Sequence, residues 1–135
     1  MRLFYSGKDG GPESKVWGFW LIEWKRLFSV AVLRFEDGSR DAYHNHAFNA
    51  LSWVLKGNLI EGVFDLENKT TRWHTSYRPS TVPIWTPRNR MHQVTSNGRT
   101  YVLTFRGPWT KTWKEYVPAY DRILTLTNGR EIVNG

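Results

Sequence analysis

Short stretches rich in β-branched and aromatic residues recur along this chain, and polar turn signals separate them. Six of these stretches lie at residues 28–35, 52–55, 59–64, 70–76, 91–95 and 101–105. Turn-forming pairs such as Asp37-Gly38 and Asn97-Gly98 stand between them, and such pairs tolerate the positive φ angles of tight hairpins. The pattern predicts an all-β fold, either an antiparallel sandwich or a barrel, in one domain spanning residues 1–135.

Two further segments bear on this sheet. Residues 123–133 contain the turn signal Asn128-Gly129 and predict a last hairpin that closes or flanks the sheet. Residues 18–28 leave two alternatives open. As a helix they would place Phe19, Ile22, Glu23 and Arg26 on one face, but a segment so rich in Trp and Phe fits a strand equally well.

Composition narrows the class of protein. Hydrophobic residues make up 40% and charged residues 23% of the chain, which is typical of a globular protein. The eight Trp, seven Phe and six Tyr supply a large apolar area for a small core. Because the chain has no cysteine, disulfide scaffolds, thiolate zinc sites and cysteine nucleophiles are excluded.

Charge and hydropathy limit the expected partners. The densest apolar run, residues 16–33, is interrupted by Glu23, Lys25 and Arg26, so the sequence predicts no membrane span. The pattern of a signal peptide is also absent, and we expect a cytoplasmic protein. The net charge of +7 favours anions, but no Lys/Arg block is present, so nucleic acid is expected to bind only by nonspecific attraction.

Candidate chemistry centres on the histidines, of which the chain has four. On a strand, alternate side chains face the same side, so His44 and His46 would project together while Asn45 points away. Two imidazoles on one face can chelate one metal ion. The same spacing also occurs in ordinary surface and core pairs, so a ligand role needs support from the surrounding sequence.

The surrounding sequence supplies two motifs. In the first motif, five residues separate Gly38 from His44, one residue separates His44 from His46, and ten residues separate His46 from Gly57. In the second motif, one residue separates Pro87 from Asn89, and two residues separate Asn89 from His92. This order resembles the two sequence motifs of the cupin superfamily, over roughly residues 28–106. The resemblance implies a small antiparallel cupin-type β-barrel, or jelly-roll sandwich, in which His44, His46 and His92 bind one divalent transition metal. It also implies a homodimer, and it leaves His74 as a strand or surface residue.

Three positions depart from the cupin motifs, and one of them is the terminal asparagine of the second motif, which is Ser96 here. The glutamate of the first motif would fall at Ala50 or Leu51, neither of which can bind a metal, and Asn49 could be at most a weak ligand. The glycine of the second motif is Asn89, which also tolerates a left-handed turn. A divalent ion held by three neutral imidazoles keeps its full charge, which favours an anionic substrate or a hydroxide in the open positions.

Within the superfamily, a set of three histidines resembles the thiol dioxygenases and the diketone-cleaving dioxygenases, which bind Fe(II). Residues 55–65, LKGNLIEGVFD, are also similar to a run in the thiol dioxygenases, and Phe105 falls where those enzymes carry a catalytic tyrosine. That substitution counts against a true thiol dioxygenase. The same segments equally resemble small uncharacterised cupin-like proteins of phages and bacteria, and this second resemblance fits the chain length better.

Other side chains are candidates for holding a substrate. If regular strand pairing begins before His92, Arg90 would share its face and hold a carboxylate or phosphate in a bidentate fork; the alternative is a solvated turn residue. Phe105 is a second candidate substrate contact, with core packing as its alternative. Arg106, at a strand end, is a weaker candidate of the same kind as Arg90, and Glu61 could face inward as a general acid or base.

These features lead to one working hypothesis. The chain is expected to be a metal-binding cupin that acts on a small, anionic metabolite, and the leading form of this hypothesis is a three-His Fe(II) dioxygenase-like enzyme. The alternatives are a metal-dependent isomerase or epimerase and a non-enzymatic module that binds a ligand or nucleic acid. Imidazole also suits zinc and nickel, so Fe(II) is preferred on the resemblance alone.

Overall fold

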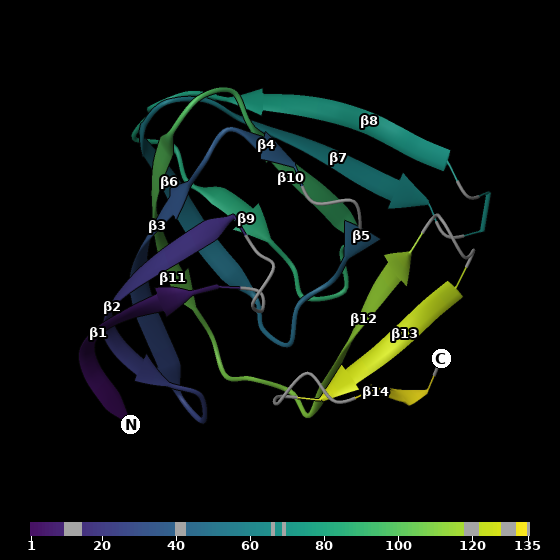
Figure 1. Cartoon of the computed structure of the whole chain (residues 1–135), viewed down its shortest axis with the longest axis horizontal. Helices are drawn as coiled ribbons and strands as arrows, with labels where there is room; N and C mark the ends of the chain where they lie inside the picture. Colours follow the sequence, from purple (N-terminus) through teal and green to yellow (C-terminus); the bar gives the residue numbers. More distant parts are fainter. Residues whose placement is uncertain are drawn as a thin grey trace.

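Two antiparallel sheets face each other in the computed structural model of this protein (Figure 1). The structure describes residues 1–9, 15–39, 43–65, 67–68, 70–117, 122–127 and 132–134. Within these residues every regular element is a strand, so the predicted all-β fold is confirmed. None of the described residues belongs to a helix that could cross a membrane.

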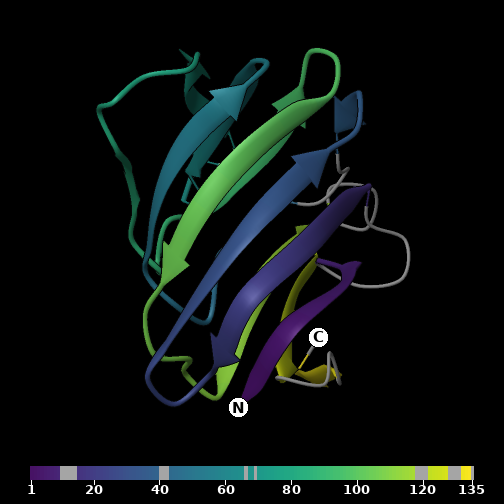
Figure 2. The ribbon, with the colours of Figure 1, turned by 90° about the vertical axis from the view of Figure 1, so that its left-hand side faces the viewer.

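The six-stranded sheet follows the order β1, β2, β3, β11, β6, β9, and Figure 2 shows the first five of these side by side. Its strands are β1 (Arg2–Lys8), β2 (Val16–Trp24), β3 (Phe28–Phe35), β11 (Thr100–Arg106), β6 (Ala50–Lys56) and β9 (Ile84–Thr86). Each neighbouring pair is antiparallel. The late strand β11 therefore lies in the middle of the sheet, between two strands from the first half of the chain.

The second sheet follows the order β14, β13, β12, β5, β10, β7, β8, and β4 pairs with the end of β10. Its strands are β14 (Ile132–Asn134), β13 (Arg122–Thr127), β12 (Thr112–Val117), β5 (Tyr43–His44), β10 (His92–Ser96), β7 (Leu59–Asp65), β8 (Thr70–Tyr77) and β4 (Gly38–Ser39). The two-residue strand β5 joins the C-terminal strands to the rest of this eight-stranded sheet. Residues around His44 therefore lie at a junction of the fold.

The core between the sheets follows from the alternation of side chains along each strand. On β3 and β11, Ala31, Leu33 and Val102 point inward and are almost fully buried. The main hydrophobic cluster consists of these three together with Trp20, Val54 and Leu59. Because Leu59 lies on β7, this cluster links the two sheets.

The predicted strands agree with the observed ones. Each of the six predicted stretches overlaps a strand, and β3 covers its predicted residues 28–35. The segment 18–28, left open between helix and strand, forms most of β2, a turn at 25–27 and the start of β3. Pairing of β13 with β14 confirms the C-terminal hairpin. Strands β1, β4, β9 and β12 have no counterpart in the sequence prediction.

A tight turn after β6 sets the position of β7. Gly57 has a φ of 100°, in the left-handed region that favours glycine. A Cβ at this position would lie 2.8 Å from the carbonyl oxygen of Arg99, too close for any side chain. The N–H of Asn58 donates to the hydroxyl of Thr100 at 3.0 Å and ties the turn to β11. This turn therefore fixes where β7 begins, at Leu59.

Candidate functional site

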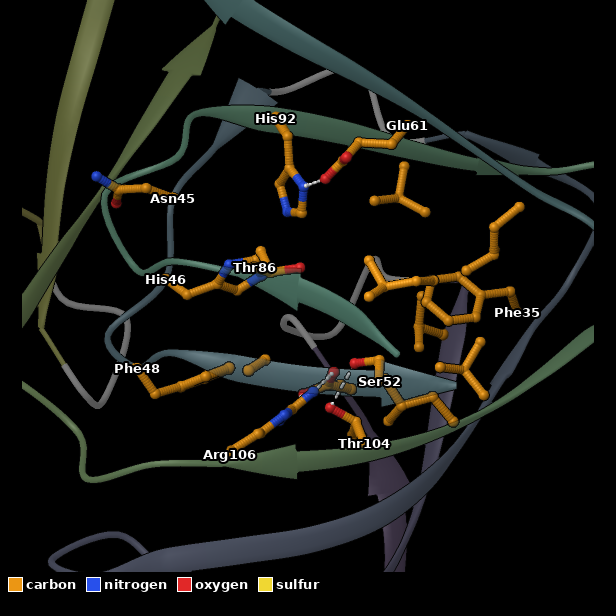
Figure 3. A pocket seen from close by; sticks show the side chains of 18 of the residues that line it. Phe35, Asn45, His46, Phe48, Ser52, Glu61, Thr86, His92, Thr104 and Arg106 are labelled. Carbon is orange, nitrogen blue, oxygen red and sulfur yellow. Dashed lines mark hydrogen bonds and ion pairs between the residues drawn. The ribbon is translucent and has the colours of Figure 1, made fainter. Parts of the chain in front are cut away.

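The two sheets enclose a cavity of about 190 Å³ that has a polar end and an apolar end. His46, His92 and Arg106 lie toward the polar end, and Phe35 marks the other end (Figure 3). The apolar end continues into the main hydrophobic cluster. A cavity of this size has the volume of about six water molecules at liquid density, so it suits a small molecule.

His92 and Glu61 meet on the cavity wall formed by the eight-stranded sheet. In the pairing of β10 with β7, Val63 lies opposite His92 and Val94 lies opposite Glu61. Because side chains two residues apart share a face, His92, Val94 and Glu61 all line the cavity. The Oε2 of Glu61 lies 2.6 Å from the Nδ1 of His92, and both residues are buried. The register of the two strands therefore creates this pair.

Glu61 is held in its charged form. Burial by itself would raise the pKa of Glu61, but the hydrogen bond with His92 and the charges of His92 and Arg90 outweigh burial and lower it below its usual value. The Nη1 of Arg90 lies 3.7 Å from Oε1. Tyr77 donates its hydroxyl to the same oxygen at 3.2 Å, and burial together with the Glu61 charge raises the pKa of Tyr77. Glu61 is thus a buried carboxylate with three partners.

His46 reaches the cavity from the segment that follows β5. Strand pairing ends at His44, so the two histidines do not share one regular strand as the sequence predicts. The N–H of His46 instead donates to the carbonyl of Arg88 at 3.1 Å. Its ring lies edge-on to the ring of His92, with centroids 4.8 Å apart and planes at 82°. The structure therefore brings His46 and His92, two of the three predicted ligands, side by side.

His44 lies at the junction of β5 with its two neighbours. Its backbone pairs with His92 on one side and with Glu115 on the other, while its side chain lies outside what the structure describes. Among the described side chains, no three His, Cys, Asp or Glu form a group that could hold a metal ion. The three-His set therefore stays a prediction. His74 lies on β8 with an exposed side chain, in agreement with its expected surface position.

The two predicted substrate contacts lie outside the cavity lining. Regular pairing on β10 begins at His92, so Arg90 precedes the strand and the parity argument does not apply to it. Arg90 instead supports Glu61 and donates to the carbonyl of Trp85 at 3.3 Å. Phe105 lies on the outer face of the six-stranded sheet with 43% of its surface exposed. Neither placement supports contact with a molecule in the cavity.

Arg106, the next residue along β11, takes the inward position instead. Because neighbouring side chains on a strand face opposite sides, the side chain of Arg106 points into the cavity, and Arg106 is 6% exposed (Figure 3). Its Nη1 and Nη2 lie 3.3 and 2.7 Å from the carboxylate oxygens of Asp9, which follows β1. Its Cζ lies 4.6 Å from the ring centroid of Phe48. Strand alternation in β11 could have predicted that Arg106 points inward. Asp9 is 97 positions away in the sequence, and no sequence pattern predicts its contact with Arg106.

The donors at the polar end fit a divalent transition metal. Imidazole nitrogen is a preferred ligand of iron, zinc and nickel. Because the Nδ1 of His92 lies against the Glu61 carboxylate, Nδ1 carries a proton and donates it there, which leaves Nε2 as the nitrogen that could bind a metal. Carboxylates in this position orient metal-binding histidines and raise their basicity. Figure 3 shows the ring of His92 directed into the cavity toward His46.

Comparisons with known proteins agree on the fold. No family model matches the chain, and no curated protein matches it in sequence. Among solved structures, a cupin-superfamily sugar phosphate isomerase from Silicibacter pomeroyi is 13% identical, with a TM-score of 0.63, over 99% of this chain and 92% of that one.

Two other solved structures carry different names and the same fold. HppE in its Fe(II) form is 18% identical, with a TM-score of 0.58, over 76% of this chain and 56% of that one. The polyketide cyclase RemF from Streptomyces resistomycificus is 16% identical, with a TM-score of 0.59, over 77% of this chain and 73% of that one. Likeness at these identities establishes the fold. The chain therefore has the fold of the cupin superfamily, and the predicted cupin-type barrel is confirmed.

Proposed function

We propose that this protein is a metal-dependent cupin enzyme that converts a small anionic metabolite, with an Fe(II)-dependent oxidation as its leading activity. The observation that carries the proposal is the pair of His46 and His92, whose rings lie 4.8 Å apart in the cavity while Glu61 orients His92. Buried titratable groups with shifted pKa values cluster at functional sites, and Glu61 is such a group.

His46 and His92 would hold the metal, and His44, whose backbone pairs with His92, is the proposed third ligand. When bound, an Fe(II) ion with open positions supplies O2 activation beside a chelating substrate. The protein's own residues prepare that site. Glu61 fixes the tautomer of His92. The buried ring of Phe48 packs 5.1 Å from the ring of His46 and limits the access of bulk water to it.

Metal content and O2 uptake together test the proposal. Protein purified anaerobically without chelators is expected to carry about one Fe, Zn, Ni or Mn per chain. The Fe(II)-loaded protein is expected to consume O2 with a candidate thiol or diketone substrate. Absence of a stoichiometric metal, or a metal content that does not change in His46→Ala, would contradict the proposal.

A metal-dependent isomerase is the second candidate. The sugar phosphate isomerase from Silicibacter pomeroyi, which matches over 99% of this chain, favours it. The hydroxyls of Ser52 and Thr104 lie 3.0 Å apart on the cavity wall and would suit a substrate with several hydroxyl groups. Uptake of O2 separates the two candidates, because an isomerase converts its substrate without consuming O2.

A further inference from the structure

We infer that the cavity takes a carboxylic acid with a short apolar chain, whose carboxylate binds Arg106 in the place that Asp9 now occupies. The inference deepens the proposed function, since it names a substrate class for the same cavity. It depends on Arg106, on Asp9 and on the apolar lining of the cavity, and binding of the carboxylate needs no metal.

Arg106 is the one Lys or Arg among the described residues that line the cavity. Its guanidinium stays charged at physiological pH, and a buried charge needs partner oxygens. Asp9 supplies two of them through Nη1 and Nη2. The buried Nε has no hydrogen-bond partner among the described residues. The guanidinium therefore has donor capacity beyond its present contact with Asp9.

Asp9 is a carboxylate that another carboxylate can replace. It follows β1, an edge strand, whereas Arg106 belongs to β11, which is paired on both sides. The side chain of Asp9 is 25% exposed and that of Arg106 is 6% exposed. Segments at a sheet edge open at lower free energy than central strands, so Asp9 can withdraw while Arg106 stays in place. The contact with Asp9 also shows that the guanidinium of Arg106 can donate two hydrogen bonds to a carboxylate in this position.

The apolar end of the cavity determines the rest of the ligand. Leu33 and Val102 from the six-stranded sheet and Leu59 from the eight-stranded sheet line it, and Phe35 lies at its far side (Figure 3). The volume of about 190 Å³ limits the ligand to a short chain. Each buried CH2 group strengthens binding by about fourfold, so affinity should rise with chain length until the cavity is full.

Phe48 separates the carboxylate position from the histidines. Its ring centroid lies 4.6 Å from the Cζ of Arg106 and 5.1 Å from the ring centroid of His46. A carboxylate on Arg106 would therefore stay on one side of this ring. The face shared by His46 and His92 is then left for the reacting part of the ligand.

Binding to chelator-treated, metal-free protein tests the inference separately from the metal. Isothermal titration with acetate, butanoate, hexanoate and octanoate is expected to show affinity that rises with chain length by about fourfold per CH2 group, up to the limit of the cavity. Hexan-1-ol has the matched chain without a charge, and methyl phosphate is an anion without the apolar chain. Both are expected to bind at least about tenfold more weakly than hexanoate. Tighter binding of methyl phosphate than of hexanoate would overturn the carboxylic acid assignment.

Two variants test the position of the carboxylate. Arg106→Gln is expected to weaken hexanoate binding by about tenfold or more. Asp9→Asn is expected to tighten it, because the competing carboxylate is gone. The control is Arg99→Gln, which changes an exposed arginine paired with Glu36 and should leave the affinity unchanged.

Equal hexanoate affinity in the native protein and Arg106→Gln would overturn the inference. If Arg106→Gln does not fold, Asp9→Asn decides alone, and an unchanged or weaker affinity in that variant overturns the inference. Because every titration uses metal-free protein, failure of the proposed metal site leaves these results interpretable.

Discussion

The two sheets line one cavity with different kinds of side chain. The wall from the eight-stranded sheet carries Glu61, Tyr77 and His92, whose side chains are joined by hydrogen bonds. The wall from the six-stranded sheet carries the permanent charge of Arg106 and the paired hydroxyls of Ser52 and Thr104. The first wall has side chains of the kinds that bind metals and exchange protons in proteins, and the second has side chains of the kinds that hold a ligand by charge and shape.

Under the proposals above, this difference separates metal binding from ligand binding within one cavity. Variants on the eight-stranded wall should change metal affinity, and variants in the six-stranded sheet should change ligand binding or stability. Each of the following variants tests this separation, beginning with the one expected to have the largest effect.

His92→Ala is expected to lower the affinity for Fe(II) or Zn by more than about 100-fold. Loss of a side chain that binds the metal directly costs more affinity than loss of a side chain that only orients a ligand. Metal titration of the chelator-treated protein measures this change. The matched control is His74→Ala, which removes an exposed histidine on β8 and should keep the native affinity. Equal losses in the two variants would contradict a metal site at His92.

Val54→Ala is expected to lower stability without changing metal affinity. Val54 is 3% exposed, belongs to the main hydrophobic cluster and does not line the cavity. The lost burial and the void left behind should lower the free energy of unfolding by about 2 kcal/mol, as measured by urea denaturation. A fall in metal affinity of the folded variant would show that the two sheets do not act separately.

Glu61→Gln is expected to lower metal affinity by about tenfold, or about 1.4 kcal/mol, because His92 loses a charged partner while the side-chain shape is kept. Glu36→Gln is the matched control, since Glu36 is more exposed and pairs with Arg34 and Arg99 on the surface. Titration of both metal-free variants gives the comparison. An unchanged affinity in Glu61→Gln would exclude the proposed orienting role.

Phe105→Leu is expected to have the smallest effect. The ring lies on the outer face of the six-stranded sheet, so the free energy of unfolding should change by about 1 kcal/mol or less. Affinities for metal and for hexanoate should stay at the native values. A clear loss of hexanoate binding would instead favour the sequence-based prediction that Phe105 contacts the substrate.

Local patterns were sufficient to predict most of the strands. β3 is filled by β-branched and aromatic residues and is bounded by the turn at Asp37-Gly38, so its range could be predicted from sequence. Strand β12 could not, because Lys114 and Glu115 interrupt its apolar pattern. The two residues of β5 are too few to show any periodicity, and their strand character comes from pairing with β10 and β12.

The candidate site was predictable only in part. Motif spacing drew attention to His46 and His92, which the fold places side by side. The contact of Glu61 with His92 depends on the register of β7 against β10, which the sequence does not specify. At β11, a single residue separates the exposed Phe105 from the inward Arg106, and a motif resemblance contains no information about which face is buried.

Anomalous diffraction from crystals grown anaerobically with Fe(II) tests the metal site most directly. The predicted result is one anomalous peak in the cavity, at a bonding distance of about 2.0–2.2 Å from the Nε2 of His92 and from a ring nitrogen of His46. Iron bound only at exposed positions such as His74, with no peak between His46 and His92, would contradict the proposed metal centre.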